Sequence, residues 1–254
     1  MTNYLPELVL AKTEDFPPLA QLYIDGAHGT LIHKKWVVTA AHASFCALPG
    51  NPLLINGKKR IIKSLHVHPQ YTSGKGNDIA LIELEQVVTD VSPAVLYNRN
   101  DEQGKSIWFI GIGGTGNGLT GQTIDNAQNQ GVLRKAQNTV LTATDSQLTF
   151  RFNRGEQAQP LEGVSGGGDS GGPAFIKNGE AFYVLGVSSR FVGGDIGEYG
   201  ITEYYSRISH FYDWITDHVN GTAEKSASNA NLKNLPSGLT EDNLNEVCTA
   251  IMIR

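Results

Sequence analysis

Short apolar runs, closely spaced along the whole chain, constrain the fold of this sequence more than any other feature. They occupy residues 31–40, 60–66, 79–84, 107–112, 147–152 and 182–188. The segments between them are rich in turn formers, and the 254-residue chain contains 29 glycines and 10 prolines. Short strands separated by frequent turn signals are typical of β-sandwiches and β-barrels, and they argue against alternating strand–helix units. With 40% hydrophobic residues the chain can bury a substantial core, so we expect one all-β unit.

Helical periodicity is found only near the C-terminus. One face of the first pattern is formed by Phe211, Trp214, Ile215, His218 and Val219. A polar stretch at 224–234 is typical of a linker, and Thr240 is a favourable N-cap for a second short helix. Its apolar face consists of Leu244, Val247, Cys248 and Ile251. We expect this helix to pack back on the barrels, and the alternative is a docking or autoinhibitory segment.

The sequence Gly-Gly-Gly-Asp-Ser-Gly-Gly-Pro at residues 166–173 has the composition of an activated serine with an anion site. Glycines around a serine allow the backbone to turn sharply and to direct several amides into one small volume. The amides of Gly168 and Ser170 are the candidates for an oxyanion hole, and the Ser170 hydroxyl is the candidate nucleophile. A serine hydroxyl is weak alone, so this hypothesis requires a base and a group that orients the base.

Both groups are present upstream. His42 follows an apolar run that predicts a buried strand, and Asp78 precedes another such run. Taken singly, each residue has a plainer interpretation, as a half-buried histidine, a strand-start cap and a glycine loop. Their joint occurrence in the order His42, Asp78, Ser170 favours nucleophilic catalysis over all three.

That order and its flanking sequences resemble the chymotrypsin/trypsin family of serine endopeptidases. The matching segments are Gly-Thr-Leu-Ile at 29–32, Trp-Val-Val-Thr-Ala-Ala-His at 36–42, His-Pro-Gln-Tyr at 68–71, and Tyr-Tyr-Ser-Arg-Ile at 204–208. The resemblance runs from about residue 9 to 222. It implies two six-stranded antiparallel β-barrels with a C-terminal helix, with His42 and Asp78 from the first barrel and Ser170 from the second. It places the domain at 1–222, a barrel boundary near 100–106, and an extra tail at 223–254.

The resemblance also implies the chemistry. A His42–Asp78–Ser170 triad would hydrolyse peptide bonds of a protein or peptide substrate through an acyl-enzyme, with Asp169 positioning the loop. In the family a cleaved apolar N-terminus usually pairs with this aspartate, but residues 7–12 read Glu-Leu-Val-Leu-Ala-Lys. Either another cation or donor satisfies Asp169, or the chain is zymogen-like. The alternative function is therefore a catalytically silent or zymogen-like relative that acts as a binding protein. An esterase is disfavoured by the order of the triad.

Specificity is indicated by four positions that the resemblance assigns to the substrate pocket. Val164 stands at the pocket floor and favours uncharged side chains. Glu203 stands at a wall position that is normally glycine, where its carboxylate could receive Lys or Arg. Arg190, next to Ser189 on the strand that lines the pocket, could instead neutralise Glu203. We expect a preference for basic P1 residues.

Only two cysteines occur, Cys46 and Cys248. Secreted animal relatives are heavily cross-linked, so this chain resembles disulfide-poor, bacterial-type members. Two free thiols are the simpler expectation. The alternative is a bridge that clamps the tail close to the active site, because Cys46 lies four residues beyond His42.

The remaining features exclude several classes of partner. The net charge is −5 and no basic run occurs, so we expect no nucleic acid partner. No membrane span and no signal peptide are evident; assuming a mature form, we expect a secreted or periplasmic protein. No cofactor is indicated. His66 and His68 supply half of a zinc site without a third ligand, and residues 51–60 lack the acids that calcium needs. The oligomeric state is not indicated.

Overall fold

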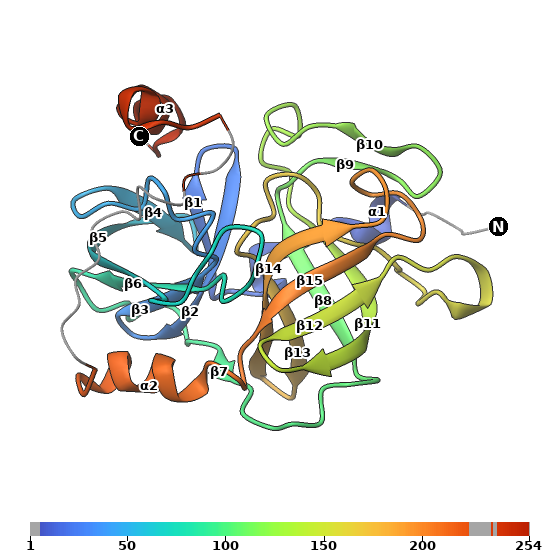
Figure 1. The fold of residues 1–254 in the computed structure, drawn as a ribbon, viewed down its shortest axis with the longest axis horizontal. Coiled ribbons are helices and arrows are strands. Elements are labelled where there is room, and N and C mark those ends of the chain that lie inside the picture. Colours follow the sequence, from blue (N-terminus) through green and yellow to red (C-terminus); the bar gives the residue numbers. More distant parts are fainter. Residues whose placement is uncertain (1–5, 224–234, 236–237, 254) are drawn as a thin grey trace.

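The computed structural model describes residues 6–223, 235 and 238–253, and its main feature is a pair of β-barrels (Figure 1). The first barrel is closed and antiparallel throughout. Its strands, in spatial order, are β1 (Leu19–Tyr23), β2 (Gly26–His33), β3 (Trp36–Thr39), β6 (Ala80–Leu84), β5 (Lys58–Val67) and β4 (Pro52–Ile55).

The second barrel closes through the pairing of β13 with β14. Its strands, in spatial order, are β13 (Pro173–Asn178), β8 (Ser106–Gly111), β11 (Arg134–Thr144), β12 (Gln147–Arg151), β15 (Thr202–Arg207) and β14 (Ala181–Val192). A short strand, β7 (Val95–Leu96), runs parallel to β14, and a separate hairpin consists of β9 (Thr115–Asn117) and β10 (Gly121–Ile124). Two single turns of 3-10 helix lie at Thr13–Asp15 and Gly155–Gln157. The expected chymotrypsin-type architecture is confirmed.

The two barrels bury different kinds of side chain. The first is filled mainly by aliphatic residues such as Leu31, Ile62 and Leu81. The second is built around aromatic rings, with Phe109 edge-on to Phe150 at 5.0 Å and stacked on Tyr205 at 5.1 Å between ring centroids. Edge-to-face and offset arrangements are the ones that the ring quadrupole favours. Tyr205 therefore belongs to the core while its hydroxyl reaches toward the predicted substrate pocket.

One predicted strand is wrong in its extent. Residues 31–40 are not one strand, because β2 ends at His33 and β3 begins at Trp36. The turn between them carries Lys34 and Lys35, charged residues that remain on the surface at a hairpin tip. The other five runs fall within or largely within β5, β6, β8, β12 and β14.

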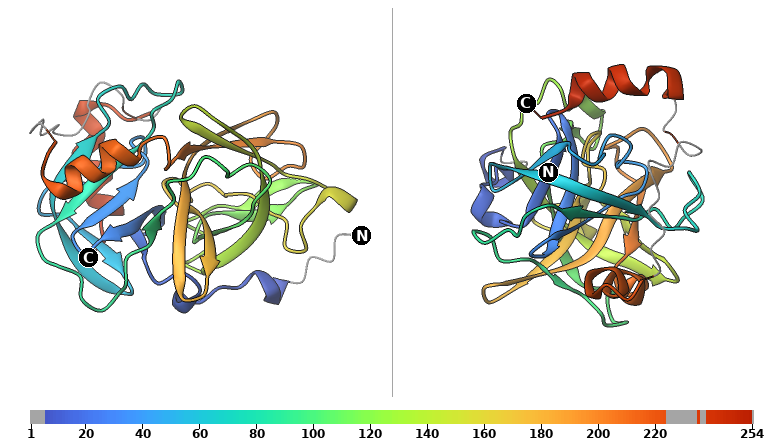
Figure 2. Two further views of the ribbon diagram at one scale, coloured as in Figure 1. Left: turned by 90° about the horizontal axis from the view of Figure 1, so that it is seen from below. Right: turned by 90° about the vertical axis from the view of Figure 1, so that its left-hand side faces the viewer.

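Three α-helices are described: α1 (Pro6–Val9), α2 (Tyr212–Asn220) and α3 (Glu241–Ile251). Helices α2 and α3 lie on opposite sides of the first barrel (Figure 2). The predicted N-cap is confirmed, because the Thr240 hydroxyl accepts a hydrogen bond from the Asn243 amide. The predicted linker at 224–234 lies outside the described residues.

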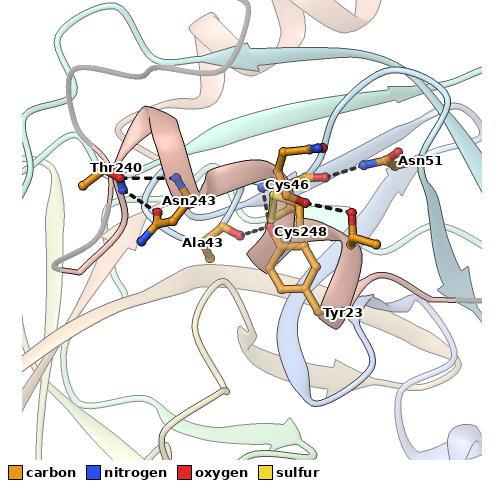
Figure 3. The surroundings of a disulfide bond; sticks show 9 residues. Tyr23, Ala43, Cys46, Asn51, Thr240, Asn243 and Cys248 are labelled. Carbon is orange, nitrogen blue, oxygen red and sulfur yellow. Dashed lines mark hydrogen bonds between the residues drawn. A yellow bond between two sulfur atoms is a disulfide. The ribbon is translucent and has the colours of Figure 1, made fainter.

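The expectation of two free thiols is wrong. Cys46 and Cys248 form a disulfide that joins residues 202 positions apart (Figure 3). Beside it, the Tyr23 hydroxyl donates to Ala43 O at 2.6 Å and accepts from Cys46 N at 3.0 Å. The tail also touches the end of β1, since Ile24 N donates to Ile251 O at 2.9 Å. The sequence could not decide between free thiols and a disulfide, because the answer depends on where helix α3, far along the chain, packs in the fold.

Candidate active site

Strand pairing brings His42 and Asp78 together. His42 lies three residues after the end of β3, Asp78 lies two residues before β6, and the register pairs Thr39 with Ala80. The end of one strand therefore adjoins the start of the other. His42 Nδ1 is 2.7 Å from Asp78 Oδ2, and the His42 amide donates to Asp78 Oδ1 at 2.9 Å. These two contacts fix both the position and the rotation of the imidazole relative to the carboxylate.

Asp78 is held from the second barrel as well. The Ser189 hydroxyl donates to Asp78 Oδ2 at 2.6 Å, and the Ser206 hydroxyl donates to the Asp78 carbonyl at 2.7 Å. Burial alone would raise the pKa of Asp78, but the charge of His42 and the hydrogen bonds from His42 and Ser189 outweigh it and lower that pKa. The carboxylate is thus ionised at neutral pH and suited to stabilise an imidazolium.

The serine loop lies against the strands that lead to His42. The amide of His28 donates to Ser170 O at 2.7 Å. At Gly171, where φ is +78°, a Cβ atom would lie 2.3 Å from Thr39 Oγ1, so only glycine fits. The hydrogen bonds of the described residues include none between the side chains of Ser170 and His42. Such contacts are often long in unliganded sites and shorten when substrate binds.

Two amides of this loop stay free while their neighbours are used. The amides of Gly166, Gly167, Asp169, Gly171 and Gly172 each have an acceptor. Within the described part of the chain, the amides of Gly168 and Ser170 have none. These are the two donors that the sequence assigned to the oxyanion hole, so the geometry is suited to bind an anionic oxygen.

Asp169 turns away from Ser170, toward the interior. Its carboxylate accepts from Gly113 N at 2.7 Å and from Gly166 N at 2.9 Å, and His28 Nδ1 lies 3.9 Å from Oδ1. Burial raises the pKa of Asp169, while the charge of His28 and the two amide hydrogen bonds oppose that rise. Among the described residues, the partners of this carboxylate are therefore two loop amides and the His28 ring.

Glu203, which the sequence assigned to the substrate pocket, is buried and only 3% exposed. Both of its carboxylate oxygens accept from Ser165 N at 3.1 Å, and the Ser165 hydroxyl bonds to the Tyr205 hydroxyl. Burial raises the pKa of Glu203 to about 8. Val164 is half-buried beside it and lines a neighbouring cavity.

Arg190 does not neutralise Glu203. Its guanidinium lies 4.2 Å from the centre of the Tyr204 ring and reaches Gln147 Oε1 at 3.5 Å. No ion pair among the described residues involves Glu203. The alternative that Arg190 cancels this charge is wrong for this structure.

Two residues that contact the loop, His28 and Gln122, were not identified from the sequence. The Gln122 side chain accepts from Gly167 N at 2.7 Å, and its backbone amide donates to Ile196 O at 2.8 Å. His28 and Gln122 stand in ordinary strand contexts, where a histidine or glutamine carries no motif. Only the three-dimensional approach of β2 and β10 to the loop identifies them.

His66 and His68, singled out as half of a zinc site, lie among aromatic rings. His66 is 5.2 Å from His218, and His68 is 4.9 Å from Trp214, between ring centroids. In the part of the chain that the structure describes, no three His, Cys, Asp or Glu residues are grouped to hold a metal ion.

Two barrels, a histidine–aspartate pair supplied by the first, and a glycine-flanked serine with two free amides supplied by the second define the class of two-barrel serine proteases. The match to the family described as Trypsin covers residues 9–215, and the chain belongs to this family. It is a serine endopeptidase, an enzyme that hydrolyses peptide bonds.

Individual relatives agree with this assignment. The chain is 27% identical to "Trypsin" from Saccharopolyspora erythraea over 84% of its own length and 97% of that protein. It is 27% identical to "Serine protease SP24D" from Anopheles gambiae over 74% of this chain and 69% of that one. "Coagulation factor XI" from Bos taurus is also 27% identical, over 76% of this chain but only 33% of the larger protein. None of the described helices is long and apolar enough to cross a bilayer.

Proposed function

We propose that this endopeptidase cleaves its substrates through a His42–Asp78–Ser170 triad and an acyl-enzyme. The observation that carries the proposal is the combination of an oriented His42–Asp78 pair with free amides at Gly168 and Ser170. Free amides are required wherever negative charge develops on the carbonyl oxygen of the substrate. If the loop used these two amides in its own hydrogen bonds, a catalytically silent binding protein would be favoured instead.

The steps follow from the hydrogen bonds. Asp78 occupies Nδ1 of His42, which leaves Nε2 as the basic nitrogen. Nε2 takes the proton of the Ser170 hydroxyl as the oxygen bonds to the substrate carbonyl carbon, and then gives that proton to the leaving amine. Water attacks the resulting ester by the reverse route and regenerates Ser170. Asp169 takes no part in proton transfer and positions the loop.

Fluorophosphonate labelling tests the triad directly. The wild-type chain should form an adduct on Ser170, located by mass spectrometry, and both Ser170→Ala and His42→Ala should lose it. Circular dichroism of all three proteins controls for folding. The absence of an adduct on well-folded wild-type protein would contradict the proposal and favour the silent or zymogen-like binding protein.

We further propose that the pocket prefers Lys or Arg at P1. Glu203 is a buried carboxylate with no cationic partner among the described residues, while Arg190 is engaged by Tyr204. A buried carboxylate gains most from a counter-ion of opposite charge, and a basic P1 side chain would supply one. Peptides with Arg, Lys, Phe, Leu or Ala at P1 test this. A preference for Phe or Leu at P1 that persists in Glu203→Ala would contradict the proposed preference for basic residues.

The C-terminal segment is proposed to dock on the first barrel as a structural brace, through the Cys46–Cys248 bridge and the Ile24–Ile251 hydrogen bond. A disulfide also fits a secreted or periplasmic location. Removal of residues 223–254 should lower stability. A gain of activity after this deletion would instead indicate an autoinhibitory segment.

A further inference from the structure

The serine loop borders a cavity, although parts of it pack closely on neighbouring backbone: a Cβ atom at Gly166 would lie 2.0 Å from Gly114 O. The cavity has a volume of about 560 Å³ and is lined among others by Gly113, Gly114, Gly166 and Asp169. Glycines contribute no side chains to fill this space, and the backbone of a glycine-rich loop has many alternative conformations. The arrangement that leaves the Gly168 and Ser170 amides free therefore depends on hydrogen bonds and other polar contacts from neighbouring segments.

His28 provides one of these contacts from β2. Its side chain is fully buried, and its Nε2 accepts from Ile112 N at 3.3 Å. The neutral ring must then carry its proton on Nδ1. Nδ1 faces Asp169 Oδ1 at 3.9 Å and the Gly168 carbonyl, neither of them in ordinary hydrogen-bond geometry, and it has no other acceptor in the described chain. A buried N–H is costly without an acceptor, so its attraction to the loop is its main compensation.

Gln122 provides a second side-chain contact, from the hairpin. Its Oε1 accepts from Gly167 N at 2.7 Å, one residue before the first free amide. The side chain lies against Gly114, where a Cβ atom would come within 2.3 Å of its Cδ. Its own backbone is tied to Ile196. Gln122 thus fixes the peptide between Gly166 and Gly167. The next two carbonyls are fixed from outside the loop, Gly167 O by Gly114 N at 2.8 Å and Gly168 O by Ala27 N at 2.7 Å.

We propose that His28 and Gln122 are positioning residues for the oxyanion hole: they hold residues 166–170 so that the amides of Gly168 and Ser170 face the substrate. The role in catalysis rests on the proposed triad, but the ordering of the loop does not. His28 acts through Asp169 and the Gly168 carbonyl, and Gln122 acts through the Gly167 amide. Neither touches the reacting atoms.

A matched pair of variants tests His28. His28→Leu removes both ring nitrogens, whereas His28→Asn keeps a donor close to the position of Nδ1. Loss of one oxyanion donor costs about 100- to 1,000-fold in kcat, so loosening the loop in His28→Leu should cost roughly 10- to 100-fold. KM should change little, and His28→Asn should recover part of the rate. Thr30→Val, a buried change two residues along the same strand, is the control that leaves kcat unchanged.

A second pair tests Gln122. Gln122→Met keeps the shape and loses the acceptor, and Gln122→Glu keeps an acceptor for the Gly167 amide. We expect kcat to fall roughly 2- to 10-fold in the methionine variant, the worth of one hydrogen bond, and to recover in the glutamate variant. Equal losses in both variants would overturn the role of the acceptor.

Hydrogen exchange of the full-length protein separates this proposal from the proposed function. The peptide spanning 163–172 should exchange faster in His28→Leu and Gln122→Met than in wild type and Thr30→Val, whether or not Ser170 forms an adduct. Unchanged exchange together with unchanged kcat in well-folded variants would overturn the proposal. A wild-type chain that forms no adduct but shows the exchange difference would contradict only the triad.

Discussion

The two sides of the candidate active site, the base wall (His42 and Asp78) and the nucleophile wall (residues 166–173), are built in opposite ways. His42 and Asp78 follow and precede adjacent strands of a barrel filled with aliphatic side chains, and Asp78 alone takes part in four hydrogen bonds. Ser170 lies in a glycine-rich loop with a cavity of about 560 Å³ behind it. The base is positioned by packing and strand register, whereas the nucleophile is positioned by hydrogen bonds that segments far apart in the chain make with the loop backbone.

The two walls should differ in how they respond to substitutions. A barrel fixes its residues through many contacts, so the loss of one rarely moves the others. A glycine loop has few side chains of its own to pack, so its order depends on the hydrogen bonds of its backbone. Substitutions at the base wall should therefore change kcat only through the loss of the replaced group. Substitutions at the nucleophile wall should also change kcat by disordering the serine loop.

The largest effect is expected for Asp78→Asn. The asparagine keeps the shape of the site but no longer fixes the His42 tautomer or stabilises the imidazolium, so kcat should fall about 10⁴-fold, the loss typical of a serine protease triad whose histidine is held in the wrong tautomer. KM and the unfolding midpoint should stay close to wild type, because the barrel holds the side chain. Steady-state kinetics with an ester and a peptide substrate measure this. A loss below about tenfold would mean that Asp78 is not the orienting group.

Removal of the disulfide should mainly weaken the base wall. Cys46 lies four residues after His42, and its partner is 202 residues away, so the bridge closes a long loop. We expect Cys46→Ala/Cys248→Ala to lose roughly 2–5 kcal/mol of unfolding free energy, measured by urea unfolding. Wild type with reductant is the matched control. Hydrogen exchange in the double variant should become faster in the peptide 40–48 and stay unchanged in the peptide 163–172. Faster exchange confined to 163–172 would show that the bridge supports the nucleophile wall and not the base wall.

The same contrast explains what sequence could predict. The barrels follow from short apolar runs, because a strand signals itself through neighbouring residues. The candidate triad and the free amides follow from local motifs. The Cys46–Cys248 bridge and the contacts of His28 and Gln122 join residues that are far apart in the chain, where no local pattern reports which side chains meet. Arg190 belongs to this group as well, since its stacking on Tyr204 depends on the side-chain direction within β14 and β15.

Glu203→Gln should remove the preference for basic P1 residues. The loss in kcat/KM for Arg and Lys substrates should be roughly 10- to 100-fold, the worth of a charged hydrogen-bonded pair, with little change for Leu. Burial raises the pKa of Glu203 to about 8, so its carboxyl group is mostly neutral below that pH and ionised above it. The ratio of kcat/KM for Arg over Leu should therefore rise with pH through about 8 in wild type. This ratio cancels the titration of the triad, and in Glu203→Gln it should stay flat.

The smallest effect should come from Ser189→Ala, which removes the hydrogen bond from the second barrel to Asp78 Oδ2. Asp78 keeps both contacts to His42, so we expect a loss in kcat of roughly 2- to 10-fold, the worth of one hydrogen bond. Ser189 acts on catalysis only through the Asp78 carboxylate in this interpretation. Its substitution should consequently cost nothing further in the Asp78→Asn background, a strong departure from additivity.

Ser206→Ala provides the comparison, because Ser206 binds the carbonyl of Asp78 and not its carboxylate. Its effect on kcat should persist in the Asp78→Asn background, since that carbonyl remains. Equal costs of Ser189→Ala in both backgrounds would show that Ser189 acts on substrate and not on Asp78. In that case the Asp78 carboxylate would owe its position to the first barrel alone, and Ser206 would hold only the Asp78 carbonyl from the second barrel.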